Sequence, residues 1–166
     1  TKANGFGGLD TELAFNSPVH IKHIQTLGKW AQEGKFTYMG RRNEAGKNFR
    51  AGECMLMTES SAGYAGIKKA AKFEFGIRHL PYYGGTEAPQ NTIIGGSSLW
   101  ALSGKSKEEN KGTAAFLAFL SRTDIQAKWH QDTGYLGVTT AAAKKTKSSG
   151  FYKANPGTDL AGIQMM

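Results

Sequence analysis

Two adjacent glycines, Gly95 and Gly96, interrupt an apolar run that otherwise reads as a buried strand. The apolar positions of that run are Ile93, Ile94, Leu99 and Trp100. Glycine weakens a strand but lets another group approach the backbone closely, so the pair can present amide N–H groups to the oxygens of a ligand. Trp100 is near enough in sequence to form part of the pocket wall. The alternative is a bulge or a barrel-like bend without a ligand.

The sequence lacks the common patterns of covalent and metal chemistry. It contains no G-x-S-x-G turn, Walker loop, H-E-x-x-H pair or Cys/His cluster. His20 and His23 are three residues apart on a predicted helix, but no third ligand follows at a spacing typical of metal sites. Glu108 and Glu109 are favourable charges at a helix start rather than an acid/base couple. The sequence therefore predicts no catalytic residue, no metal and no cofactor, and it disfavours an enzyme.

Composition indicates a globular protein, and the alternation of predicted helices and strands described below makes it an α/β one. The chain has 166 residues, of which 39% are hydrophobic, which is enough for one ordinary core and a single domain. Its net charge of +8 comes from basic residues scattered along the chain, which favours a solvated face over a nucleic-acid-binding stripe. Cys54 is the only cysteine, so no intrachain disulfide forms. The longest nearly apolar stretch, 113–120, is far short of the roughly 18 to 20 residues of a membrane span.

Helices and short strands are expected to alternate in the first part of the chain. Cap and periodicity signals predict helices over about 18–33, 43–52 and 62–72. Short apolar runs predict strands at 36–39, 54–57 and 73–77, before a loop at 81–89 and the strand that contains the glycine pair.

The second part of the chain is predicted to be mainly helical. Ser106 with Glu109, and Thr123 with Gln126, have capping-box spacing ahead of helices over 113–120 and 125–132. A further helix is expected over 139–147, and Gly, Asn and Pro punctuate a loop-rich tail. These elements must position the residues that contact a ligand.

Several motifs together resemble the glycerol-phosphate branch of the bacterial extracellular solute-binding proteins, which serve ABC importers. The resemblance covers nearly the whole chain. Its motifs are Tyr38-Met-Gly-Arg41, Thr58-Glu-Ser-Ser61, Ala88-Pro-Gln-Asn91, Ile94-Gly-Gly96, Ser98-Leu-Trp100 and Trp129-His-Gln-Asp-Thr-Gly-Tyr-Leu136. The helix followed by Thr-Gly-Tyr-Leu is general to the superfamily, whereas the serine pair and the glycine run point to the glycerol-phosphate branch.

The resemblance implies a periplasmic-binding-protein type II fold, with a mixed sheet flanked by helices and ligand trapped between two lobes. Residues 1–166 would form a single domain that is part of the C-terminal lobe, with the N-terminal lobe and the C-terminal tail absent. The implied function is to capture sn-glycerol 3-phosphate or a glycerophosphodiester in the periplasm and to deliver it to a membrane permease. A lone lobe is expected to bind weakly and to self-associate through exposed apolar surface.

Three ligand contacts of the family fall on matching positions, Ser60, Gly96 and Tyr135. Ser60 would offer a hydroxyl beside helix N–H groups, Gly96 a main-chain N–H, and Tyr135 a phenol. Ser61, Gly95 and Trp100 are expected near the ligand. Without the resemblance, Ser60 reads as an ordinary N-cap and Tyr135 as a core aromatic whose hydroxyl reaches solvent.

Two positions depart from the family pattern. Gly137 stands where proline is usual after Tyr-Leu, so a looser loop is expected behind Tyr135. Glu59 stands where a small residue is usual, and its carboxylate would repel a phosphate unless it points away. A different sugar or polyol therefore stays open as the ligand, and a nucleic-acid-binding module remains a remote alternative.

Overall fold

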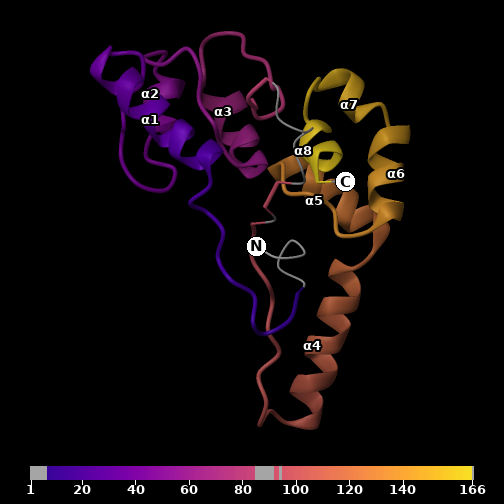
Figure 1. Ribbon diagram of the computed structural model, residues 1–166. Coiled ribbons are helices and arrows are strands. Elements are labelled where there is room, and N and C mark those ends of the chain that lie inside the picture. The colour runs from indigo at the N-terminus through magenta and orange to yellow at the C-terminus, as the bar shows by residue number, and fades with distance from the viewer. Residues whose placement is uncertain (1–6, 85–91, 94, 166) are drawn as a thin grey trace. The chain divides into compact units, whose positions relative to one another are not determined.

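The computed structural model describes residues 7–84, 92–93 and 95–165 of the chain. The chain divides into two compact units, Thr1–Ala45 and Gly46–Met166, each of which is taken by itself below. Figure 1 shows their helices.

The first unit is built around helix α1 (Pro18–Gln32), close to the predicted range of 18–33. Pro18 occupies the first turn, where its missing N–H is not needed, and its fixed φ favours the helix. No residue of α1 is buried. The helix end carries exposed ion pairs, in which Glu33 contacts Lys29 at 3.8 Å and Lys35 at 2.8 Å.

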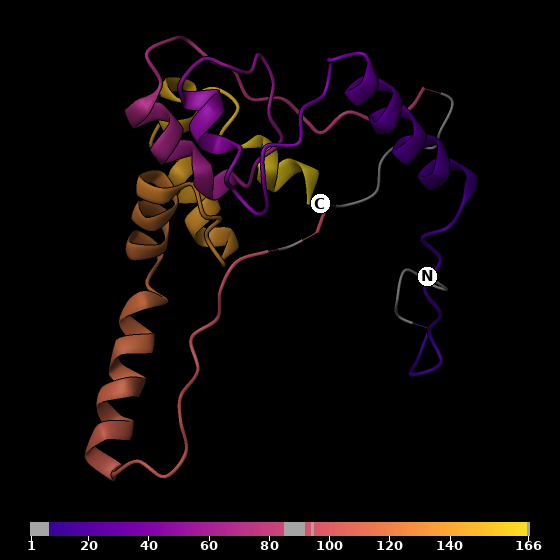
Figure 2. The same cartoon turned by 90° about the vertical axis from the view of Figure 1, so that its left-hand side faces the viewer.

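The second unit is helical in the residues that the structure describes. Its helices are α2 (Gly46–Arg50), the 3₁₀ turn η2 (Ser61–Gly63), α3 (Tyr64–Ala70), α4 (Lys107–Leu120), α5 (Thr123–Thr133), α6 (Thr140–Ser148), α7 (Phe151–Ala154) and α8 (Leu160–Gln164). Helix α5 contacts α3, α4 and α6, and α6 contacts α7, as Figures 1 and 2 allow the reader to follow. The tail predicted as loop-rich therefore contains two short helices, α7 and α8, which is a correction.

Local capping signals explain where α4 and α6 begin. The Ser106 hydroxyl accepts from the Glu109 N–H at 3.1 Å, and the Glu109 carboxylate accepts from the Ser106 N–H at 2.9 Å, so the first capping box is confirmed. Thr139 caps α6 by accepting from Ala142 N. The second predicted box is wrong, because α5 begins one residue earlier with Arg122 as its N-cap and no side-chain cap.

Two aromatic clusters hold the second unit together. Phe49 of α2 packs edge-on against Phe73 and Phe75, and Tyr64 of α3 lies 6.2 Å from Phe75 between ring centroids. A second cluster joins α5 to α7 and is described with the candidate site. Among the described residues, the buried apolar side chains are Ile67, Ala127 and Ala142.

The expected mixed sheet is not confirmed. No strand occurs in residues 7–84, 92–93 and 95–165, and the segments predicted as strands connect the helices without strand pairing. Ile93 and Trp100 of the glycine run are 94% and 85% exposed, so the prediction that this run is buried is wrong for its described residues. Met55, in the segment predicted as a strand at 54–57, is 103% exposed. A strand is stabilised by hydrogen bonds to a neighbour, and these segments find none there. Ile94 and residues 85–89 of the predicted loop lie outside the described residues.

Cys54, the only cysteine of the sequence, is half-buried, in keeping with its position in an apolar run. In the described part of the chain, no helix combines the length and the apolar composition that crossing a bilayer requires. The prediction of a single domain over 1–166 stays a prediction.

Replacing Thr146 with valine is expected to stabilise the protein. Thr146 lies on α6 with 1% of its surface exposed, and its hydroxyl has no hydrogen-bond partner. A buried unsatisfied polar group costs about 1–3 kcal/mol, so an apolar side chain of the same shape should raise the free energy of unfolding by about 1 kcal/mol. Urea denaturation measures the change as a higher midpoint at constant slope.

Thr158→Val is the matched control, because Thr158 is also buried but its hydroxyl donates to the Asn155 carbonyl at 2.7 Å. This second variant should lower stability, since the Asn155 carbonyl loses its shorter hydrogen bond and keeps only the one from the Thr158 N–H at 3.3 Å. A fall in stability for Thr146→Val would contradict the interpretation that the buried Thr146 hydroxyl lacks a hydrogen-bond partner.

Candidate functional site

The serine pair forms the turn that leads into α3. Ser60 is the N-cap of η2 with extended backbone angles, and its Oγ accepts from the Ala62 N–H at 3.3 Å. The side chain is exposed, and its own hydroxyl proton remains available for a further hydrogen bond. The N-cap interpretation is therefore confirmed, and it leaves room for a ligand contact by the same hydroxyl.

Glu59 lies within this serine turn rather than away from it. Its Oε1 accepts from the Ser60 N–H at 2.8 Å. Its Cγ would lie 2.7 Å from a Cβ added at Gly63, so the side chain runs across that glycine. A negative charge therefore stands beside Ser60, and it uses an amide that an anionic ligand could otherwise bind.

The end of α5 contacts the serine turn directly. Gly134 ends the helix in the left-handed conformation, with φ at +84°. A Cβ added there would meet Ser61 O at 2.2 Å and Tyr64 Cβ at 3.4 Å. Only glycine combines this backbone angle with this close approach. The fold thus places Tyr135 one residue from the point where α5 meets the Ser60–Ser61 turn.

Tyr135 has a fixed backbone and a partly free side chain. Its N–H donates to Thr133 Oγ1 at 3.2 Å, and its carbonyl oxygen lies 2.8 Å from His130 Nδ1. The residue is 43% exposed, so the phenol can meet solvent or a ligand. The alternative of a core aromatic whose hydroxyl reaches solvent is therefore wrong about the core position, while the exposure agrees with a hydroxyl that reaches solvent.

Behind Tyr135 lies the second aromatic cluster, centred on the buried His130. The imidazole is 4% exposed and packs edge-on against Phe151 and Tyr152 at 5.9 and 5.7 Å between ring centroids. His130 Nε2 lies 3.1 Å from the Tyr152 hydroxyl. Burial raises the pKa of Tyr152, and the negative charge of Asp159 adds to the effect, so this phenol stays protonated at neutral pH.

Asn155 connects α3 to the turn after α7. Its Oδ1 accepts from the Tyr64 hydroxyl at 3.0 Å and from Lys68 Nζ at 2.5 Å, and its Nδ2 donates to the Phe151 carbonyl at 3.0 Å. Sequence reasoning missed this buried role and took Asn155-Pro156-Gly157 only as loop punctuation. A buried asparagine must satisfy both ends of its amide, but the two partners of this Oδ1, Tyr64 and Lys68, lie far away in sequence.

The loop after Tyr135 is held by Gln126 of α5. The Val138 N–H donates to Gln126 Oε1 at 3.1 Å, while Gln126 Nε2 donates to the Leu120 carbonyl at 2.7 Å. A Cβ added at Gly137 would lie 3.2 Å from Ala142 Cβ. The looseness expected from a glycine at position 137 is thus opposed by a specific hydrogen bond.

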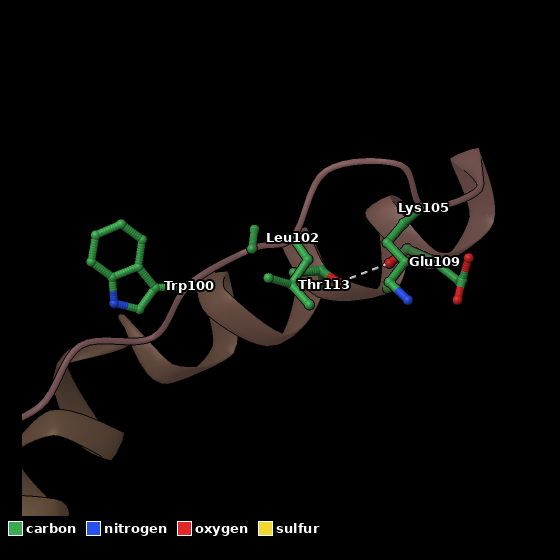
Figure 3. Close-up of a pocket in the computed structure, with 7 residues that line it drawn as sticks. Trp100, Leu102, Lys105, Glu109 and Thr113 are labelled. Atoms are coloured by element: carbon green, nitrogen blue, oxygen red, sulfur yellow. Dashed lines mark hydrogen bonds between the residues drawn. The ribbon is translucent and has the colours of Figure 1, made fainter.

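The glycine pair and Trp100 lie on a different segment from the serine turn. Both glycines are exposed with nothing within 4 Å of an added Cβ, and Gly96 has φ at +111°. Trp100 lines an open groove of about 380 Å³ between its own segment and α4. Figure 3 shows Trp100 at one end of this groove and Lys105 with Glu109 at the other. The described contacts therefore bring the segment of Ser60 and Ser61 next to the segment of Tyr135, but they connect neither segment to Gly95, Gly96 or Trp100.

The groove and the histidine pair offer little chemistry. The Ser106 amide and hydroxyl hydrogen-bond to the Glu109 carboxylate and lower its pKa, so this carboxylate serves the helix cap. His20 Nδ1 lies 2.6 Å from Ser17 Oγ. Within the described ranges, no group of three or more His, Cys, Asp or Glu side chains could hold a metal ion.

Comparison with known proteins identifies the class. Residues 3–159 match the family model described as bacterial extracellular solute-binding protein. The chain belongs to this family.

Individual relatives are more specific. The chain is 50% identical over 167 residues to the sn-glycerol-3-phosphate-binding periplasmic protein UgpB of Yersinia pseudotuberculosis. It is 51% identical over 166 residues to the protein of the same name in Rhizobium meliloti and 46% identical over 167 residues to that of Salmonella typhimurium. Each comparison covers 100% of this chain and 38% of the relative.

Proposed function

We propose that this chain forms part of the C-terminal lobe of a periplasmic substrate-binding protein of an ABC importer. Its ligand is sn-glycerol 3-phosphate or a glycerophosphodiester. The contact of Gly134 with Ser61 carries the proposal, because it sets Ser60 and Tyr135 on adjoining segments. Support also comes from the names of relatives about half identical over the whole chain.

The geometry of the serine turn suits a polyhydroxylated or phosphorylated ligand. Ser60 has a hydroxyl proton to donate, and the phenol of Tyr135 can donate or accept. Gly96 supplies a third contact through its main-chain N–H when the rest of the protein closes over the ligand. Binding involves no covalent step, so the protein acts as a receptor rather than as an enzyme, and closure shifts an equilibrium between open and closed states.

The partners follow from this role. The loaded protein docks on the membrane permease, and it needs no nucleic acid, metal or cofactor. The chain taken alone is expected to self-associate, because large apolar side chains such as Trp100, Phe116 and Phe119 are exposed on it.

A ligand panel tests the proposed function. A ligand that binds only the folded state stabilises it, by about 2.7 kcal/mol when the ligand concentration is 100 times Kd, and this raises the melting temperature. The full-length protein that contains this chain should therefore melt at a higher temperature with glycerol 3-phosphate than with glycerol or maltose. A rise with maltose alone would keep the transport class and replace the ligand.

Replacing Glu59 with glutamine is expected to strengthen binding of a phosphate ester. Glutamine keeps an oxygen for the Ser60 N–H but removes the negative charge beside Ser60. Exposed charge interactions are worth about 0.2–1 kcal/mol, so the affinity for glycerol 3-phosphate should rise roughly 1.5- to 5-fold. Glu108→Gln at the exposed start of α4 changes the net charge equally and should leave the affinity unchanged. Weaker binding by Glu59→Gln would indicate that the carboxylate contacts the ligand as an acceptor.

A further inference from the structure

We propose that His130 is a positioning residue that sets the orientation of Tyr135 toward the ligand. The inference rests on the proposed function, since it assumes that Tyr135 contacts the solute. His130 is a buried residue of α5 that faces α7. One of its ring nitrogens contacts the Tyr135 carbonyl oxygen, and the other contacts the Tyr152 hydroxyl.

The hydrogen bonds define the tautomer of His130. A carbonyl oxygen only accepts, so the contact of 2.8 Å between His130 Nδ1 and Tyr135 O requires a proton on Nδ1. In the neutral ring Nε2 then has a free lone pair, and the Tyr152 hydroxyl, 3.1 Å away, donates to it. The raised pKa of Tyr152 keeps that donor protonated. Every polar atom of the buried imidazole is therefore paired.

This pairing acts on one particular peptide group. Gly134 turns the chain back at the end of α5, and Tyr135 is the first residue after that turn. Thr133 Oγ1 accepts from the Tyr135 N–H, and His130 holds the Tyr135 carbonyl. With both backbone groups fixed, the Cα–Cβ bond of Tyr135 has a set direction, which limits the positions that the half-exposed phenol can reach before the ligand arrives.

The rings around His130 extend this arrangement to α7. Phe151 and Tyr152 hold the imidazole by edge-on contacts, and the Phe151 carbonyl accepts from Asn155, which also binds Tyr64 of α3. Tyr64 is the first residue of α3, directly after η2, so the same network supports the serine turn and Tyr135.

A histidine that only fills space makes a different prediction from one that positions Tyr135. The amide nitrogen of asparagine can occupy the place of Nδ1 as a donor, and the amide oxygen of glutamine the place of Nε2 as an acceptor, because each is the same number of bonds from Cβ as the ring nitrogen it replaces. His130→Asn can therefore keep the bond to Tyr135, whereas His130→Gln keeps only a partner for Tyr152. Both variants lose imidazole packing and should lose stability.

The test compares the two variants in the full-length protein by titration with glycerol 3-phosphate and by thermal unfolding. We expect His130→Asn to bind within about threefold of the wild type and His130→Gln to bind at least about tenfold more weakly, although both melt at lower temperatures. Equal loss of affinity in the two variants, or no loss in His130→Gln, would overturn the proposal. Tyr152→Phe, which removes only the hydroxyl, is expected to weaken binding about threefold, and unchanged binding would show that the hydrogen bond from Tyr152 to His130 does not help to position Tyr135.

A second measurement keeps the inference separate from the proposed ligand. In a sample labelled with ¹⁵N-histidine, the nitrogen spectrum should show His130 with its proton on Nδ1 and none on Nε2, and that proton should exchange slowly with water. The opposite tautomer would overturn the inference whichever solute the protein binds. If the tautomer is as expected but glycerol 3-phosphate does not bind the wild type, the proposed ligand is wrong and the positioning of Tyr135 is retained.

Discussion

Replacing Gly134 with alanine is expected to destabilise the protein strongly and to abolish ligand binding. The new Cβ would lie 2.2 Å from the Ser61 carbonyl oxygen and 3.2 Å from its carbon. These are backbone atoms, so the serine turn or the end of α5 must move. The left-handed conformation itself costs a residue with a Cβ about 1–2 kcal/mol, and the displacement should bring the total to about 3 kcal/mol or more.

Gly150→Ala is the matched control for this prediction. Gly150 also has a left-handed backbone, with φ at +77°, but nothing lies within 4 Å of an added Cβ. Gly150→Ala should lower the free energy of unfolding only by the cost of the left-handed backbone, about 1–2 kcal/mol, and it should leave the ligand affinity unchanged. Urea unfolding and ligand titration of both variants measure the difference. Equal destabilisation of the two would show that the contact with Ser61 does not constrain position 134.

Removing the phenol oxygen of Tyr135 should produce the largest loss of affinity without loss of stability. In Tyr135→Phe the ring remains, while the ligand loses a hydrogen bond, which is worth about 1.5–3 kcal/mol when one partner is charged. The dissociation constant for glycerol 3-phosphate should therefore rise roughly 10-fold to 150-fold. Because the residue is 43% exposed, the melting temperature should stay close to that of the wild type.

A double-mutant cycle with Ser60→Ala extends this test. Ser60 and Tyr135 lie on segments in direct contact, and groups that share a ligand usually show coupling of about 0.5–3 kcal/mol. Tyr82→Phe is the control, since Tyr82 is 64% exposed and outside the candidate site. An unchanged affinity in Tyr135→Phe would remove this phenol from the binding site.

The helices could be predicted from the sequence because their signals are local. Pro18 at the start of α1 and the Ser106–Glu109 box at the start of α4 act within a single turn, and both helices begin where these residues place them. The box proposed for Thr123 and Gln126 failed because Gln126 instead bonds to Leu120 and Val138. Spacing alone does not reveal that competition.

The sheet and the packing of the site could not be predicted in the same way. A strand depends on a partner that can be distant in sequence, and apolar residues such as Ile93 and Trp100 are exposed where no partner is present among the described residues. The contact of Gly134 with Ser61, and the bonds of Asn155 to Tyr64 and Lys68, join residues more than 70 positions apart. Contacts between such distant residues leave no periodic pattern in the sequence from which they could be predicted.

The candidate site was accessible mainly through the resemblance to a family. Ser60 and Tyr135 were assigned by matching motifs, and the structure brings their segments together. Gly96 was assigned in the same way, but its described neighbours do not connect it to them. His130 carried no signal beyond its place in the Trp-His-Gln motif, because its role depends on a carbonyl five residues later and on Tyr152.

Calorimetric titration of the full-length protein with glycerol 3-phosphate tests the central claim most directly, with glycerol and maltose titrated as controls. The account predicts saturable heat with one ligand per protein for the phosphate ester and none for either control. Saturable binding of maltose, with no heat from the phosphate ester, would contradict it.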